Sequence, residues 1–149
     1  MGVRYGKPCL MAVGFFVASV LAGCGSVPLG ATYQEMIGVP ADKAVVYFYR
    51  PSLPYEYGVV FDIQANGAPV VGLADGSYFP WVSAPGLVTF TSRRAGEKTS
   101  ELPVNVEAGQ SYYVQLMPAP GLFRYRPVLM LAHEEHARRE IVGCRRVLR

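Results

Sequence analysis

Short runs of β-branched and aromatic residues, each closed by a turn signal, follow one another from residue 43 to residue 131. The first is Ala44 to Tyr49 (AVVYFY), which ends before Arg50-Pro51, where the proline cannot extend a strand ladder. Val59 to Gln64 and Pro69 to Leu73 flank Asn66-Gly67, the type of pair that most strongly predicts a tight hairpin. This punctuation predicts an all-β sandwich or barrel.

The pattern continues toward the C-terminus. Further strands are predicted at Ser77–Val82, Leu87–Ser92, Leu102–Val106, Ser111–Met117 and Val128–Leu131. From His133 to Val142, Glu and Arg are frequent and Ala137 and Ile141 lie four apart, which favours a helix. We therefore expect a single antiparallel β-sandwich of about seven to eight strands with a short C-terminal helix.

The N-terminal residues have the order of a secretory signal peptide. Arg4 and Lys7 precede an almost wholly apolar run from Cys9 to Ala22, and small residues follow. The alternative is a retained transmembrane helix, which needs about 20 predominantly apolar residues. The continuous apolar run stops short of that length, so a cleaved signal helix is the favoured interpretation.

Leu21-Ala22-Gly23-Cys24 comes directly after the apolar run and resembles the lipobox of bacterial lipoproteins. The resemblance implies cleavage between Gly23 and Cys24 and acyl chains such as palmitate on Cys24, whose thiolate is the nucleophile. Two or more acyl chains anchor a protein stably in a membrane, whereas a single acyl chain anchors it only marginally. Gly25 stands where an Asp would indicate retention in the inner membrane, so we expect an outer-membrane anchor facing the periplasm.

These features divide the chain into a signal peptide (1–23), a lipidated N-terminus and tether (24–42) and a sandwich domain (43–149). Gly and Pro punctuate the expected tether. The formal net charge is +3, but export disfavours a nucleic-acid partner. We expect the membrane and another envelope protein as partners, and no cofactor.

Several motifs occur in a fixed order: Tyr47-Phe48-Tyr49-Arg50-Pro51, the Asn66-Gly67 pair, residues 108–114 (AGQSYYV) and residues 139–145 (REIVGCR). Together they resemble a family of small bacterial lipoproteins catalogued as a domain of unknown function. The middle of the domain also resembles PEGA-type β-sandwich modules. These resemblances imply a sandwich in the cell envelope and supply no catalytic residue.

Aromatic and arginine residues on predicted loops are the candidate binding residues. Loop aromatics beside arginines are frequent at protein interfaces. Alternatively, they cap the open ends of the sandwich, or they bind a small envelope ligand. The candidates are Tyr55, Tyr57, Phe123, Arg124 and Tyr125.

His133 and His136 are the metal-ligand candidates, because residues three apart share a helix face. Cys144 or a glutamate would be a third ligand, and Cys144 is alternatively the centre of a thiol-dependent activity. Structural zinc normally has four well-spaced ligands, so a solvated, charged helix face is the favoured interpretation. An unpaired Cys144 is most often a small buried hydrophobe. No complete set of catalytic roles is evident, so we expect a protein that is not an enzyme.

Five arginines lie in the last twelve positions. Arg138 and Arg139 are expected to pair with Glu134 and Glu135 on the same helix. For the arginines from 145 to 149, two alternatives remain: they face solvent, or they contact an anionic lipid surface.

Overall fold

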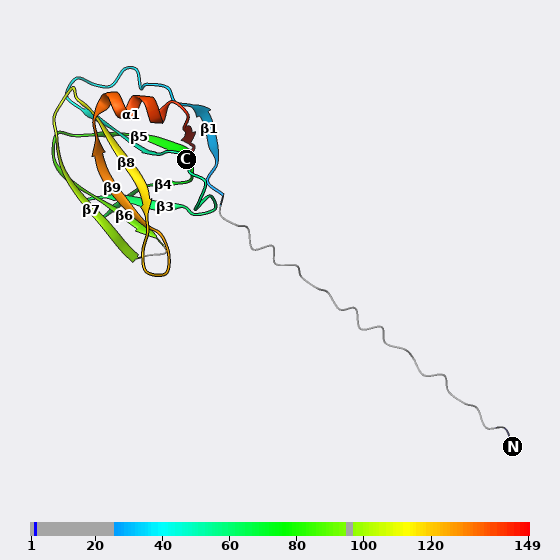
Figure 1. Cartoon of the computed structure of the whole chain (residues 1–149). Helices are drawn as coiled ribbons and strands as arrows, with labels where there is room; N and C mark the ends of the chain where they lie inside the picture. The colour runs from blue at the N-terminus through cyan, green and yellow to red at the C-terminus, as the bar shows by residue number, and fades with distance from the viewer. Residues whose placement is uncertain (1, 3–25, 95–96) are drawn as a thin grey trace.

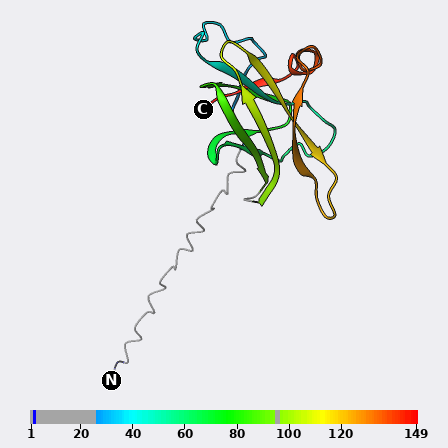
Figure 2. The same ribbon diagram turned by 90° about the vertical axis from the view of Figure 1, so that its left-hand side faces the viewer.

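The computed structural model describes residues 26–94 and 97–149, together with Gly2, and these form two packed β-sheets with one short helix (Figures 1 and 2). The predicted all-β sandwich is thus confirmed. The first five strands are β1 (Leu29–Thr32), β2 (Ala44–Arg50), β3 (Phe61–Ala65), β4 (Ala68–Leu73) and β5 (Ser77–Ser83). They are followed by β6 (Gly86–Arg94), β7 (Glu97–Val106), β8 (Ser111–Ala119), β9 (Arg126–Ala132), α1 (Glu134–Ile141) and β10 (Arg145–Val147).

Sheet A has the strand order β1-β10-β5-β2-β8-β9, and sheet B has the order β4-β3-β6-β7. The chain leaves sheet A after β2 and again after β5, and it returns from a hairpin of sheet B each time. β2 and β8 are neighbours that run parallel, and β10, which the chain reaches after α1, runs parallel to its neighbour β5. The sandwich therefore has two parallel pairings where the sequence pattern predicted antiparallel ones throughout.

The hairpin between β3 and β4 forms where Asn66-Gly67 predicts it. Asn66 has φ 48° and Gly67 has φ 82°, so both turn residues adopt the left-handed conformation that a two-residue hairpin favours. The Asn66 side-chain oxygen accepts a hydrogen bond from the Thr89 amide at 2.9 Å, which fastens the turn to β6.

The core between the sheets is apolar. Every residue of β2 is buried, and Ala44, Val46 and Phe48 belong to the inner cluster. The ring of Phe48 meets that of Phe90 edge-on, with 5.0 Å between centroids. Residues of sheet B fill the opposite side of this inner core: Phe61, Ile63, Leu73, Val88, Phe90 and Val104.

A second core lies on the outer face of sheet A. Residues 33–39 and α1 cover this face, and α1 is the helix drawn across sheet A in Figure 1. Ala137 and Ile141 are the buried residues of α1, which extends over the predicted helix to within a residue at each end. The sheet contributes mainly aromatic residues to this outer core: Val45, Tyr47, Tyr49, Tyr78 and Tyr113.

Two strands lie outside the predicted set. β1 falls in the segment expected to be a tether, and β10 in the arginine-rich tail, and the two pair antiparallel with Leu29 opposite Val147. Val27 and Leu29 also pack against the inner core. From Val27 onward, therefore, the expected tether is part of the folded domain. No helix among the described residues is long and apolar enough to span a membrane.

Candidate binding surface

The loop after β2 is held by a buried arginine. Arg50 is fully buried, and its guanidinium donates to the Glu56 carbonyl at 2.7 Å and to the Val59 carbonyl at 2.6 Å. It also lies 4.9 Å from the centroid of the Phe61 ring. Burial lowers the pKa of Arg50, and the nearby carboxylates of Asp75 and Glu56 oppose that shift. Residues 51–60 are thus fixed to the end of the central strand.

A second arginine joins this loop to the hairpin between β8 and β9. The Glu56 carboxylate lies 3.0 Å from the Arg94 guanidinium, which also donates to the Tyr125 carbonyl at 2.6 Å. The rings of Tyr55 and Tyr125 stack with centroids 5.0 Å apart and planes inclined by 22°. Tyr55 and Tyr125, two of the predicted binding residues, therefore hold the two loops together.

The remaining candidates lie on the exposed part of these loops. Phe123 is 94% exposed and Tyr57 is 63% exposed. Leu122, which sequence reasoning did not select, is 90% exposed. Arg124 and Phe123 line two shallow hollows of about 310 and 420 Å³ beside the hairpin tip. The loops thus present a compact apolar tip on a stacked aromatic base, which suits contact with another surface.

The metal-ligand candidates do not converge. His133, directly before α1, and His136, on α1, are both exposed, and the His136 Nε2 atom lies 3.4 Å from the Glu140 carboxylate. Cys144 is buried in the outer core, where its thiol points to the Arg50 carbonyl at 3.5 Å. Within the described part of the chain, no group of three or more His, Cys, Asp or Glu residues could hold a metal ion.

Burial also determines the chemistry of Cys144. Removal from water, together with the nearby carboxylates of Glu140 and Asp75, raises the pKa of this thiol to about 12. A buried thiol with a raised pKa is a poor nucleophile. Cys144 is therefore a packing residue of the outer core.

Hydroxyl groups connect the outer core to its covering segments. The Tyr49 hydroxyl donates to the Glu140 carboxylate at 2.9 Å, and the Gln115 side-chain amide donates to the same oxygen at 2.7 Å. The amide of Met36 donates to the Tyr47 hydroxyl at 2.9 Å. Burial raises the pKa of Tyr47 and of Tyr49. Sequence reasoning missed these bonds because each joins residues far apart in the chain.

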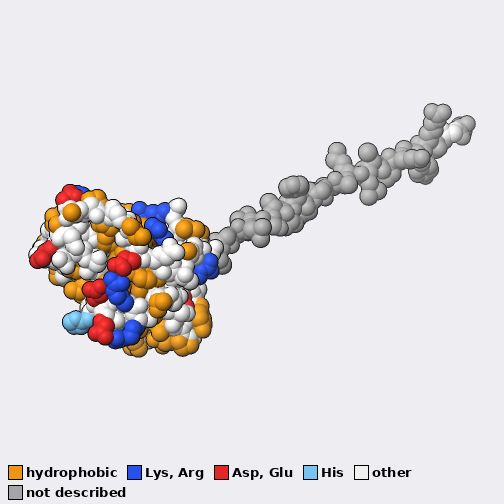
Figure 3. All heavy atoms as spheres, turned by 90° about the horizontal axis from the view of Figure 1, so that it is seen from above, with side chains coloured by type: hydrophobic (Ala, Val, Ile, Leu, Met, Phe, Trp, Pro, Cys, Tyr) orange, Lys and Arg blue, Asp and Glu red, His pale blue; other side chains and the backbone are white. Residues whose placement is uncertain are grey.

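The charged face of α1 forms the ion pairs that the sequence predicts. Arg138 contacts Glu134 at 2.8 Å and Arg139 contacts Glu135 at 3.1 Å, both at four-residue spacing. Arg138 also forms a two-pronged pair with Glu35, at 2.9 and 3.2 Å, which lowers the pKa of that carboxyl. Figure 3 shows acidic and basic side chains interspersed on this side of the molecule.

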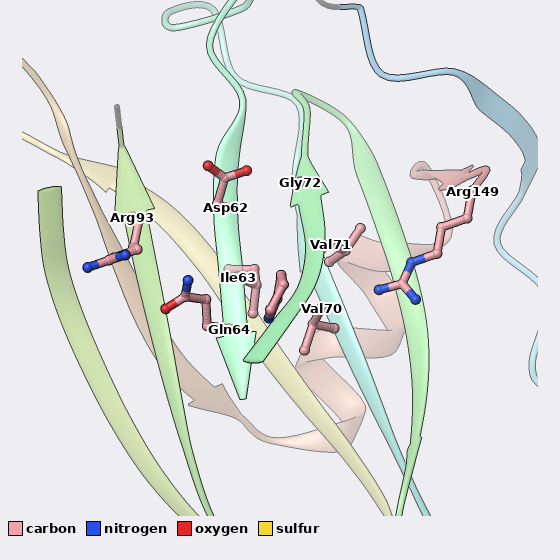
Figure 4. A pocket seen from close by; sticks show the side chains of 9 residues that line it. Asp62, Ile63, Gln64, Val70, Val71, Gly72, Arg93 and Arg149 are labelled. Atoms are coloured by element: carbon pink, nitrogen blue, oxygen red, sulfur yellow. The ribbon is translucent and has the colours of Figure 1, made fainter. Parts of the chain in front are cut away.

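A hollow of about 590 Å³ lies over β3 and β4 of sheet B. Figure 4 shows Asp62, Gln64 and Arg93 on one side of it and Arg149 on the other, beyond β4. It is wide and open, and its charged side chains are of both signs: Asp62 is acidic, and Arg93 and Arg149 are basic. It has no concentrated set of groups that would define a ligand.

Gly23 and Cys24, the predicted cleavage and lipidation residues, lie outside the described residues. No protein-family model matches the chain, and neither a curated protein nor a solved structure matches it significantly.

Proposed function

We propose that this chain is a lipoprotein of the bacterial cell envelope, anchored through lipid on Cys24 and carrying a non-catalytic domain that binds or supports other envelope components. The observation that carries the proposal is Leu21-Ala22-Gly23-Cys24, directly after a run with the order of a signal peptide. The folded domain begins to pack at Val27, just after the predicted cleavage site, which agrees with a mature protein starting at Cys24. Gly25 favours the outer membrane.

A non-catalytic role is supported by what the reactive groups do in the fold. The thiol of Cys144 is buried, and the Glu140 carboxylate accepts bonds from Tyr49 and Gln115. These groups stabilise the outer core rather than line a hollow. The exposed tip at Leu122 and Phe123, together with exposed Tyr57 on the loop that the Tyr55–Tyr125 stack joins to this hairpin, is the surface proposed to contact an envelope protein.

The anchor is tested by growing cells with a radioactive fatty acid. The wild-type protein should incorporate the label, and Cys24→Ser should abolish it, because the serine hydroxyl is a much weaker nucleophile than a thiolate. Cys9→Ser and Cys144→Ser are matched controls that should keep the label. Labelling of Cys24→Ser would refute the anchor.

The protein contact is tested with a photo-crosslinking residue at Phe123 in intact cells. We expect capture of a defined envelope protein from this position. The same residue at Leu87, which is 68% exposed, is the control and should capture none. Recovery of only the monomer at native expression from both positions would count against protein binding by this tip.

A further inference from the structure

The C-terminal strand lies directly beside the residues that follow the proposed anchor. β10 pairs with β1, and the Leu148 amide donates to the Pro28 carbonyl at 2.9 Å. Val27 already packs against the inner core. The chain between Cys24 and Val27 can span at most about 11 Å, since an extended chain advances about 3.3–3.6 Å per residue. A lipid on Cys24 would therefore hold β1 and β10 close to the bilayer surface.

Three exposed arginines lie on this part of the molecule: Arg145, Arg146 and Arg149. The Arg145 guanidinium donates to the carbonyls of Gly30 and Leu29 at 3.0 and 3.1 Å, which orients it without neutralising its charge. Arg149 lies over the ring of Phe79, with its guanidinium carbon 4.8 Å from the centroid. None of these three forms a salt bridge with a carboxylate in the part of the chain that the structure describes.

The arginines of α1 are different, because Arg138 and Arg139 are each paired with glutamates. Basic residues without such partners are free to bind anions, and a basic residue near an anionic bilayer gains about 1 kcal/mol. Leu148, between Arg146 and Arg149, is 47% exposed and adds an apolar contact. The charge and the position of this surface both match an anionic lipid headgroup layer.

We propose that Arg145, Arg146 and Arg149 bind the anionic phospholipid headgroups of the bilayer that holds the lipid on Cys24, and so fix the orientation of the domain on the membrane. This inference rests on the proposed anchor. The anionic headgroups would be the partner of the arginine-rich C-terminal segment. The domain would then lie with β1 and β10 against the membrane.

The test uses the lipidated full-length protein, reconstituted into vesicles of phosphatidylcholine alone or mixed with phosphatidylglycerol. A fluorophore is attached at Leu148→Cys, and quenching by nitroxide-labelled lipid headgroups is measured. The buried thiol of Cys144 should not react under native conditions, so the label enters at one position. A label at Leu87→Cys is the control. β10 pairs with the first residues of β5, whereas Leu87 lies shortly after the last residue of β5, at its other end.

We expect strong quenching at position 148 in the phosphatidylglycerol vesicles, weaker quenching in phosphatidylcholine, where only the anchor holds β10 near the bilayer, and a decrease with added salt. Arg146→Gln combined with Arg149→Gln should weaken the contact about 25-fold, or about fivefold for each arginine. Arg138→Gln combined with Arg139→Gln removes the same two charges from α1 and should leave the quenching unchanged. Arg145 is kept in all variants, so that its bonds to β1 are preserved.

Two results would overturn the headgroup contact alone: equal quenching at positions 148 and 87, or no effect of the double arginine variant in protein that carries fatty acid. Loss of quenching at 148 in intact envelopes, with a protein crosslinked there instead, would also overturn it and would identify a protein as the occupant. Absence of fatty-acid label on the wild-type protein would instead refute the proposed anchor, and with it this proposal.

Discussion

Sheet A is covered on both faces, and the two covers differ in chemistry. On the inner face, Phe48 and its neighbours pack against aliphatic and aromatic residues of sheet B. On the outer face, tyrosines of the same strands pack beneath residues 33–39 and α1, and several of their hydroxyls form hydrogen bonds with those segments. The inner core therefore depends on the burial of apolar surface, whereas the outer core also depends on bonds that fix each cover in one position.

The largest difference between these regions should appear when the inner core loses a ring. Phe48 is fully buried, so Phe48→Ala should lower the free energy of unfolding by about 3–5 kcal/mol through lost burial and a remaining cavity. Urea unfolding of the detergent-solubilised protein measures this. Phe123→Ala removes the same ring from an exposed tip and should change stability by less than about 0.5 kcal/mol. Equal effects of the two substitutions would contradict the assignment of Phe48 to the core.

The outer core should show a specific sensitivity to alkaline pH. The pKa of Cys144 is about 12 in the folded protein, against an ordinary 9.0, so the folded state keeps a proton that the unfolded state loses. The stabilisation is complete below pH 9.0 and is lost as the pH rises toward 12. The wild-type protein should thus lose about 1.4 kcal/mol more per pH unit in this window than Cys144→Ala.

This comparison between wild-type and Cys144→Ala removes the contribution of the tyrosines, because both proteins retain them. Urea unfolding at pH 8.5 and at pH 10.5 measures the two slopes. Parallel slopes for the two proteins would show that the thiol ionises in the folded state, and that the outer core admits water.

A smaller effect should come from one tyrosine hydroxyl. Tyr49→Phe removes the bond to Glu140 and keeps the ring in place, so the loss of stability should be about 1.5 kcal/mol, as for a hydrogen bond to a charged group. Tyr57→Phe removes a hydroxyl from an exposed loop and should have no measurable effect. If Tyr49→Phe is also neutral, the hydroxyl does not contribute to holding α1.

The smallest effect should come from the ion pair at the rim of the outer core. Glu35→Gln breaks the two-pronged pair with Arg138, but both side chains are partly exposed, so the loss should be about 0.5 kcal/mol and should diminish with salt. Glu107→Gln is an exposed control. A loss above about 2 kcal/mol would place this pair among the main supports of residues 33–39.

The strands and turns were predictable because their signals are local. Asn66-Gly67 can adopt the two positive φ angles of a tight hairpin, and alternating or β-branched runs favour strands wherever they occur. Arg138 and Arg139 could be paired with Glu134 and Glu135 because helix geometry alone brings these residues together. In each case, the residues that decide the outcome lie within four positions of one another.

The loop surface and the strand order were harder to predict from the sequence, because they depend on contacts between distant segments. Tyr55 and Tyr125 were predicted to bind a partner, yet they stack on each other once Arg50 and Arg94 fix the two loops. Leu122 has no distinguishing sequence signal, and only its position at the hairpin tip exposes it. β1 and β10 also lack a clear sequence signal. They are short runs that become strands because β1 pairs with β10 and β10 pairs with β5.

The sequence by itself determined an all-β chain with a helix near its end, and it placed a lipobox-like motif just before the folded domain. These features follow from local backbone preferences, hydrophobic periodicity and the chemistry of a cysteine nucleophile. Tertiary structure decided which groups remain available for function. Burial placed the Cys144 thiol in the outer core, and stacking gave Tyr55 and Tyr125 a structural role between two loops. The pairing of β1 with β10 brought Arg145, Arg146 and Arg149, which have no carboxylate partner among the described residues, close to Val27 at the start of the folded domain. Such outcomes depend on which distant segments meet, because desolvation and charge pairing are properties of the assembled surface.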